Sequence, residues 1–192
     1  MGTEFELKFL AEESVFEPLK LESTDWTSFE MATTYYDTAD AQLSKRRWTL
    51  RRRFENGVSV CTLKTPAGKL ERQEFELECG DIHAAIPQLC GMGAPAELLD
   101  LTAHGVLEVC SARFHRWAGQ VTLGENRVEL ALDKGVLMGG GREQPFVEVE
   151  VELKAGDPSV AVAYAKSLAQ RFGLRPESQS KYKRALTLAG KG

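Results

Sequence analysis

The chain has 192 residues, of which 43% are hydrophobic and 27% are charged, an ordinary composition for a globular protein. Its net charge of −4 excludes a general attraction to nucleic acid or to anionic membranes, so a polyanion site must be a local basic cluster. No apolar stretch approaches the roughly 20 residues that span a bilayer, and no export signal is visible. We therefore expect a cytoplasmic protein that binds neither nucleic acid nor membrane.

The four cysteines are scattered, and no two of them form a Cys-x-x-Cys pair. Without an export signal, this spacing favours buried thiols over disulfides. The three histidines show no metal-ligand spacing with these cysteines, which argues against a zinc site.

The first stretch, residues 4–9, alternates strictly between charged and apolar side chains. This pattern predicts a β-strand, whose side chains point to opposite faces with period two. Glu4, Glu6 and Lys8 share one face, and the two carboxylates lie about 7 Å apart because each residue adds roughly 3.3–3.4 Å. This face is either solvated or close to a cation.

Residues 11–22 could form a short helix that Pro18 limits, and residues 31–38 suit a strand. The basic run 45–54 then interleaves arginines with Trp48, Leu50 and Phe54, which predicts a folded strand with an arginine face. The turn signal Asn56-Gly57 leads into a hairpin partner at residues 58–64. A further strand is expected over residues 69–78.

Residues 81–101 have helical spacing with Asp81 as a plausible N-cap, and we interpret them as a helical insertion into the sheet. Strand patterns resume near Val106, with turns expected at residues 118–120 and 124–126, and residues 127–133 again alternate.

Residues 147–154 alternate apolar residues with an acidic row, Glu148, Glu150 and Glu152. The Asp157-Pro158-Ser159 sequence predicts a C-terminal helix over residues 158–173, capped by Gly173. The basic tail 178–184 could be a frayed end or a part of the fold.

The charged faces of these strands are rows of like charge. A closed antiparallel barrel explains them: the apolar faces pack outward under the helices, and the charged faces line a wet lumen. Carboxylate rows without cysteine or histidine favour Mg²⁺ or Mn²⁺. Basic rows beside a metal are typical of phosphate-ester or phosphoanhydride chemistry.

The sequence resembles the CYTH, or triphosphate tunnel metalloenzyme, superfamily, and most closely its bacterial inorganic triphosphatases. Glu4-x-Glu6-x-Lys8 is similar to the N-terminal motif of that family. The matching motifs that follow in order are Tyr36-Asp37-Thr38, Leu50-Arg51-x-Arg53, Leu63-Lys64, Arg72-x-Glu74, Glu129-x-Ala131-x-Asp133-x-Gly135, Glu148-x-Glu150-x-Glu152 and Ser180-Lys181. In residues 113–116 only Arg116 fits the family pattern.

The resemblance implies a mainly β fold: a single domain over residues 1–192 that forms an eight-stranded antiparallel tunnel with helices outside. It also implies roles for individual residues. The implied catalytic residues are Glu4, Glu6, Lys8 and Glu150. The implied phosphate ligands are Lys8, Arg51, Arg53, Lys64, Arg72, Arg116, Lys181 and Arg184. The implied ligands of Mg²⁺ or Mn²⁺ are Glu4, Glu6, Glu148, Glu150, Glu152 and Asp133, supported by Glu74, Glu76 and Glu129.

The activity implied is metal-dependent hydrolysis of inorganic triphosphate to diphosphate and phosphate, with this small molecule as the binding partner. Two alternatives stay open. The same tunnel could serve a class IV adenylate cyclase or a thiamine or nucleoside triphosphatase, or the chain could bind polyphosphate without catalysis. The sequence does not decide between a monomer and a homodimer.

Overall fold

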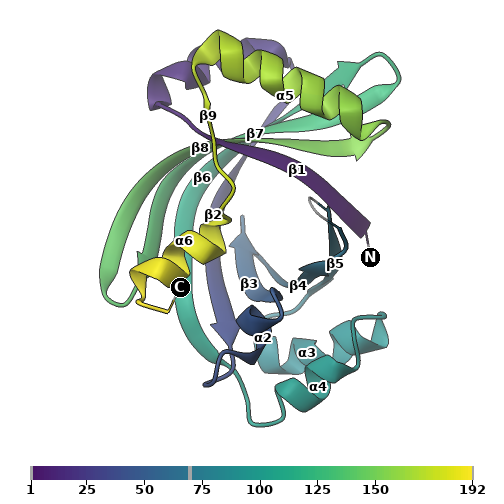
Figure 1. Cartoon of the computed structure of the whole chain (residues 1–192), viewed down its shortest axis with the longest axis vertical. Helices are drawn as coiled ribbons and strands as arrows, with labels where there is room; N and C mark the ends of the chain where they lie inside the picture. The colour runs from purple at the N-terminus through teal and green to yellow at the C-terminus, as the bar shows by residue number, and fades with distance from the viewer. Residues whose placement is uncertain (1, 69–70, 192) are drawn as a thin grey trace.

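The computed structural model describes residues 2–68 and 71–191, in which eight antiparallel strands close into a barrel (Figure 1). The strands are β1 (Gly2–Leu10), β2 (Trp26–Asp37), β3 (Thr49–Glu55), β4 (Val58–Pro66), β5 (Glu71–Glu78), β6 (Leu107–Leu123), β7 (Asn126–Gly139), β8 (Arg142–Ala155) and the two-residue β9 (Arg175–Pro176). The helices are α1 (Phe16–Leu19), α2 (Gln42–Lys45), α3 (Ile82–Gly91), α4 (Glu97–Leu101), α5 (Pro158–Phe172) and α6 (Lys181–Leu188).

Strand β1 closes the barrel because its two halves have different partners. The sheet order is β5-β4-β3-β2-β6-β7-β8-β1, and a further pairing joins β5 to β1. The first half of β1 pairs with β5, with Glu4 opposite Arg72, and the second half pairs with β8, with Glu6 opposite Glu152. On the edge of β1 that pairs with β5 in its first half, the end of the second half pairs with β9 instead. The motif-bearing strand predicted at residues 4–9 therefore lies at the seam.

Tight turns set the register of the hairpins. Asn56 and Gly57, between β3 and β4, have φ values of 44° and 97°, and Gly140 and Gly141, between β7 and β8, have 59° and 74°. Positive φ at both central residues is the geometry of type I′ turns, whose twist suits antiparallel strands. The turn predicted at Asn56-Gly57 is thereby confirmed.

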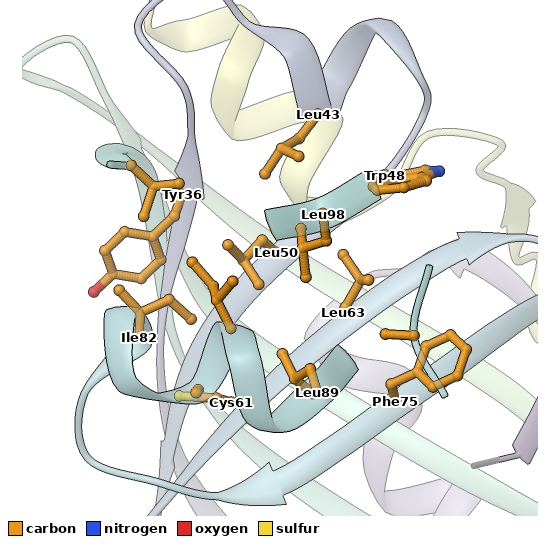
Figure 2. Packing of buried hydrophobic residues seen from close by; sticks show 14 residues of the cluster. Tyr36, Leu43, Trp48, Leu50, Cys61, Leu63, Phe75, Ile82, Leu89 and Leu98 are labelled. Atoms are coloured by element: carbon orange, nitrogen blue, oxygen red, sulfur yellow. The ribbon is translucent and has the colours of Figure 1, made fainter. Parts of the chain in front are cut away.

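The apolar faces point outward and are covered by helices. One core cluster lies between β3–β5 and the helices α3 and α4, where Leu50, Leu63 and Phe75 meet Leu89 and Leu98 (Figure 2). A second cluster joins β1 and β6–β8 to α1 and α5, and Figure 1 shows α5 lying across these strands. Because the apolar stripes are used on the outside, the charged stripes of the same strands face inward, as the alternation predicts.

Helices α3 and α5 begin at aspartates whose side chains satisfy a free backbone amide. The Asp81 side chain accepts a hydrogen bond from the Ala84 amide at 2.9 Å at the start of α3, and Asp157 accepts one from the Ser159 amide at 2.8 Å at the start of α5. Gly173 ends α5 with φ 65°. These helices occupy the ranges in which the sequence places helices.

Three local predictions need correction. Residues 118–120 do not form a turn, because β6 continues through them. The ring of Trp26 packs directly on Gly119, where a Cβ would lie only 2.8 Å from Trp26 Cε2. The basic strand begins only at Thr49, since Arg47 has a left-handed φ of 59°. The segment 11–22 is two short 3₁₀ turns around α1 rather than one helix.

Helix α6 is the exception to the outward arrangement. It follows β9 and lies across the concave side of the barrel (Figure 1), where Tyr182 and Leu186 pack with Met31, Tyr35 and Phe114 of β2 and β6. These three side chains also line the central cavity. The basic tail is therefore part of the fold and occupies one side of the tunnel.

The remaining expectations concern the cysteines, membrane-spanning segments and the extent of the domain. No disulfide links the four cysteines, of which Cys61 and Cys110 are buried. Among the described residues, no helix has the length and apolar character needed to cross a membrane. The strand expected at residues 69–78 is observed from Glu71 onward, and residues 69–70 lie outside the described ranges, as do the two ends of the single domain expected over 1–192.

Candidate active site: a charged tunnel

The barrel encloses a cavity of about 700 Å³, which is the size of a small-molecule site. Its wall is the charged face predicted from the alternation: Glu4, Glu6 and Lys8 of β1 lie on it together with Arg51 and Arg53 of β3. The other predicted site residues on this wall are Lys64, Arg72, Glu74, Glu76, Arg116, Glu129, Glu150, Glu152 and Lys181. The structure therefore brings most of the predicted residues to one tunnel.

One part of the tunnel, here called the acidic wall, is formed by the carboxylates of Glu4, Glu6, Glu129 and Glu152. Glu152 lies opposite Glu6 on one neighbouring strand and opposite Glu129 on the other. Burial raises the pKa of the Glu152 carboxyl, Lys154 opposes the shift, and the negative charges of Glu4 and Glu129 add to it. The acidic wall thus concentrates negative charge.

Lysines of the chain itself bind to the acidic wall. The Nζ of Lys64 lies 2.5 Å from Glu4 Oε2, and the Nζ of Lys8 lies 2.9 Å from Glu6 Oε1. Burial opposes the charge of Lys8, but Glu6 and Glu150 outweigh it and raise the pKa of Lys8. Lys8 is therefore charged, and both lysines are held close to the carboxylates until other ions compete for them.

Arg51 and Arg53 of β3 form a second part of the tunnel, and they carry incompletely used hydrogen-bond donors. Arg53 Nη1 donates to Glu55 Oε1 at 2.6 Å, and Arg51 Nη2 donates to Glu74 Oε1 at 3.3 Å. The Nε atoms of both arginines are buried without a hydrogen-bond partner in the described part of the chain. Burial and then the neighbouring charges of Arg51 and Arg116 lower the pKa of Arg53. This surplus of buried donors and positive charge suits an anion.

A third group of charges is buried deeper, between the barrel wall and α6. Arg116 forms a bidentate pair with Asp133, with both distances 2.7 Å, and contacts Glu150 at 2.5 Å. Lys181 of α6 lies 2.8 Å from Asp133 and 2.7 Å from both Glu148 and Glu150. Arg184, one turn further along α6, also binds Glu148.

The two glutamates of this group differ in their pKa. Burial favours the neutral form of Glu150, but Lys181 and Arg116 outweigh it and hold its pKa well below the ordinary value. Burial raises the pKa of Glu148 to about 7, with Lys181 opposing the shift and Glu150 adding to it. Glu148 and Glu150 thus act as a coupled pair in which Glu150 retains the charge.

Three predicted site residues do not line the cavity. Asp133 and Glu148 have fully buried side chains and hold Lys181 and Arg116 from behind, and Arg184 is turned toward Glu148. Sequence reasoning missed Glu55 and Lys154, which do line the cavity. The period-two row of β8 continues to Lys154 after Glu152, so the same alternation that located the acids would have located this lysine.

A closed antiparallel barrel with acidic and basic residues along its inner wall defines a class of proteins with a charged central tunnel. The chain belongs to the CYTH family: the family model described as CYTH domain matches residues 2–186. It is 29% identical over 165 residues to the inorganic triphosphatase of Haemophilus influenzae, and these residues make up 84% of this chain. The match covers 46% of the Haemophilus protein, so the chain spans about half the length of this relative.

Solved structures share the fold. The PH1819 protein of Pyrococcus horikoshii OT3 superposes with a TM-score of 0.69 at 24% identity, covering 96% of this chain and 98% of that one. HpAC1 of Hippeastrum, described as having a dominant triphosphatase activity, superposes with a TM-score of 0.60 at 18% identity, covering 97% and 96% of the two chains. At these identities the likeness establishes the architecture.

CYTH triphosphate tunnel enzymes generally use divalent metals, and the acidic wall has the donor chemistry for one. Its donors are carboxylate oxygens, which hard cations such as Mg²⁺ and Mn²⁺ prefer. In the described residues, no three histidine, cysteine, aspartate or glutamate side chains are already gathered as a metal centre. The carboxylates are instead held by lysines, which a divalent cation would have to displace.

Proposed function

We propose that this protein hydrolyses inorganic triphosphate to diphosphate and phosphate with Mg²⁺ or Mn²⁺. The observation that carries the proposal is a pair of buried donors, the Nε atoms of Arg51 and Arg53, which have no hydrogen-bond partner among the described residues. Both arginines line the same cavity as the acidic wall. A linear polyanion with bound cations would supply acceptors to the arginines and positive charge to the carboxylates. A neutral ligand would satisfy neither.

The comparisons support a triphosphatase of some kind. The chain belongs to the CYTH family, and a relative with 29% identity is named inorganic triphosphatase. The choice of inorganic triphosphate over an organic triphosphate is our proposal, as are the need for metal, the single-domain organisation and action in the cytoplasm.

The basic residues would bind the phosphates and stabilise the charge that develops during transfer. We assign this role to Arg51, Arg53, Lys64 and Lys8, with Arg72 and Arg116 on the same wall. In phosphoryl transfer, charge spreads over the equatorial and leaving oxygens, and prepositioned cations stabilise it without reorganisation. Lys8 and Lys64 could turn from Glu6 and Glu4 to a phosphate oxygen.

The carboxylates would hold the metal and position the reactants. We assign metal binding to Glu4, Glu6, Glu150 and Glu152, supported by Glu129, and Glu74 positions Arg51. A divalent cation bound there would supply Lewis-acid stabilisation of phosphate charge and help to activate the attacking water. We propose that Asp133 and Glu148 act from behind by fixing Arg116 and Lys181, and that Lys181 and Arg184 primarily seat α6.

The reaction consumes one water molecule. Its oxygen forms a bond to a terminal phosphorus, the P–O bond to the bridging oxygen breaks, and diphosphate leaves with the electron pair. The proton lost by the water passes to the medium or to the departing anions. The protein's cations stabilise both the transferred group and the leaving diphosphate.

The test is a substrate panel with the wild-type protein. We expect phosphate release from tripolyphosphate in Mg²⁺ or Mn²⁺ to exceed that from ATP and thiamine triphosphate, and EDTA to abolish it. Formation of cyclic AMP and diphosphate from ATP would favour a cyclase. Tight binding of tripolyphosphate without turnover in either metal would favour a binding module.

A further inference from the structure

Lys154 is a cation of the tunnel wall to which the proposed reaction gives no role. It lies on β8, two residues beyond Glu152, and continues the inward-facing row of that strand. Its Nζ is 2.9 Å from Glu152 Oε1 and 3.6 Å from Glu129 Oε1. One ammonium group thus bridges two carboxylates of the acidic wall, from two neighbouring strands.

Two further side chains act on the carboxylates of this bridge. Glu4 is close enough to act electrostatically on Glu152, and the amide of Gln120 donates to the second oxygen of Glu129 at 2.9 Å. The side chain of Lys154 is 34% exposed, whereas those of Glu152 and Glu129 are 24% and 18% exposed. The lysine therefore reaches in from the more open side and can withdraw without breaking the core.

Lys154 differs in this respect from Lys8 and Lys64. All three lysines line the same cavity as Arg51 and Arg53. Lys8 and Lys64, however, each contact one carboxylate of the acidic wall, Glu6 and Glu4 respectively, and their side chains are only 14% exposed. Lys154 contacts Glu152 and Glu129 alone among the described carboxylates. Its charge is therefore committed to the same oxygens that a divalent cation would use.

We propose that Lys154 is a built-in counter-ion that competes with the divalent cation for Glu152 and Glu129 and so limits metal occupancy of the acidic wall. The inference rests on the metal site of the proposed function. It follows from charge balance: cation and ammonium cannot both approach these oxygens closely, because like charges at such short range repel strongly in a partly buried site. Removal of the ammonium leaves the carboxylates facing one another without compensation, which also favours metal.

The test measures binding of Mn²⁺ alone by isothermal titration calorimetry, without triphosphate. We expect Lys154→Met to bind Mn²⁺ about tenfold more tightly than the wild type or to take up an additional ion. Lys154→Gln repeats the test with a polar side chain in case the methionine variant folds poorly. Lys134→Met is the matched control: Lys134 pairs with Glu13 at 2.7 Å on the outside of the barrel, and its removal should leave Mn²⁺ binding unchanged.

The outcomes separate this inference from the proposed function. Equal or weaker Mn²⁺ binding by both Lys154 variants, with a wild type that binds Mn²⁺, overturns the role of Lys154 alone. Absence of binding by wild type and variants overturns the metal site and this inference together. Tighter binding by the Lys154 variants supports the inference even if the wild type does not hydrolyse triphosphate.

Discussion

Two adjacent arginines of β3 show how a single step along a strand changes the role of a side chain. Arg53 points into the tunnel, where its Nε is buried and has no hydrogen-bond partner in the ranges 2–68 and 71–191. Arg52 lies on the outer face and donates to the carbonyl oxygen of Gly80 at 2.9 Å. Their charge and length are the same, so any difference between their variants reports on the tunnel itself.

We predict that Arg53→Gln lowers kcat/KM for tripolyphosphate by roughly 10- to 100-fold, the loss expected when one charge-assisted hydrogen bond worth about 1.5–3 kcal/mol is removed. Arg52→Gln should stay within about twofold of the wild type. Initial rates of phosphate release measure both variants. Equal losses of kcat/KM in the two variants would contradict the proposal that Arg53 binds the anion on the inner face of the barrel.

At this scale the sequence predicts which way side chains face but not which of them pair. Alternation places Arg51, Arg53 and Glu150 inside, because a strand allows only two directions. The contact between Lys181 and Glu150 depends instead on the path of the chain through β9 and on where α6 comes to rest. No periodicity within one element contains that information.

Helix α6 contacts the barrel through both buried charges and apolar side chains. Lys181 is bound by three carboxylates and is almost fully buried, whereas Lys183 on the same helix is exposed. Burial opposes the charge of Lys181, but its carboxylate partners outweigh this and raise its pKa. The first turn of α6 is therefore attached to the barrel wall by buried charge pairs, in addition to the apolar contacts of Tyr182 and Leu186.

We predict that Lys181→Met frees α6 from the wall, because removing one partner of a buried ionic group leaves uncompensated charge at a cost of about 3–5 kcal/mol. Amide hydrogen exchange in residues 181–188 should become faster than in the wild type. Lys183→Met is the control and should exchange like the wild type. Unchanged protection of α6 in Lys181→Met would mean that its apolar contacts alone hold it.

The raised pKa of Glu148 gives the folded protein a characteristic pH dependence. In the unfolded chain this carboxyl ionises near its ordinary value of 4.5, but in the folded protein it ionises at about 7. Between these values Glu148 binds more protons in the folded protein than in the unfolded chain, so its contribution makes the free energy of unfolding fall as the pH rises. Urea unfolding at a series of pH values measures this free energy, and Glu148→Gln should remove its decline with rising pH. Parallel pH profiles of the wild type and the variant would contradict the role of Glu148.

At the scale of the whole molecule, alternation and turn residues are sufficient to predict a barrel with a charged interior. The failures have physical causes that lie outside the local pattern. Glycine is common in turns, so the sequence predicts a turn at Gly119. In the structure Gly119 lies within a strand, and its lack of a side chain leaves space for the ring of Trp26 from another strand. The closure of the barrel through both halves of β1 likewise depends on two partners distant in the sequence.

The most direct measurement of the central claim is metal-dependent phosphate release from tripolyphosphate by the wild type, Glu6→Gln and Glu17→Gln. Glu6 lies on the acidic wall, whereas Glu17 on α1 is exposed and pairs with Lys20. We predict that the wild type and Glu17→Gln turn over tripolyphosphate with Mg²⁺ or Mn²⁺, and that Glu6→Gln remains folded but loses at least about 100-fold in kcat. Full activity of Glu6→Gln, or no turnover by the wild type in either metal, would contradict the account.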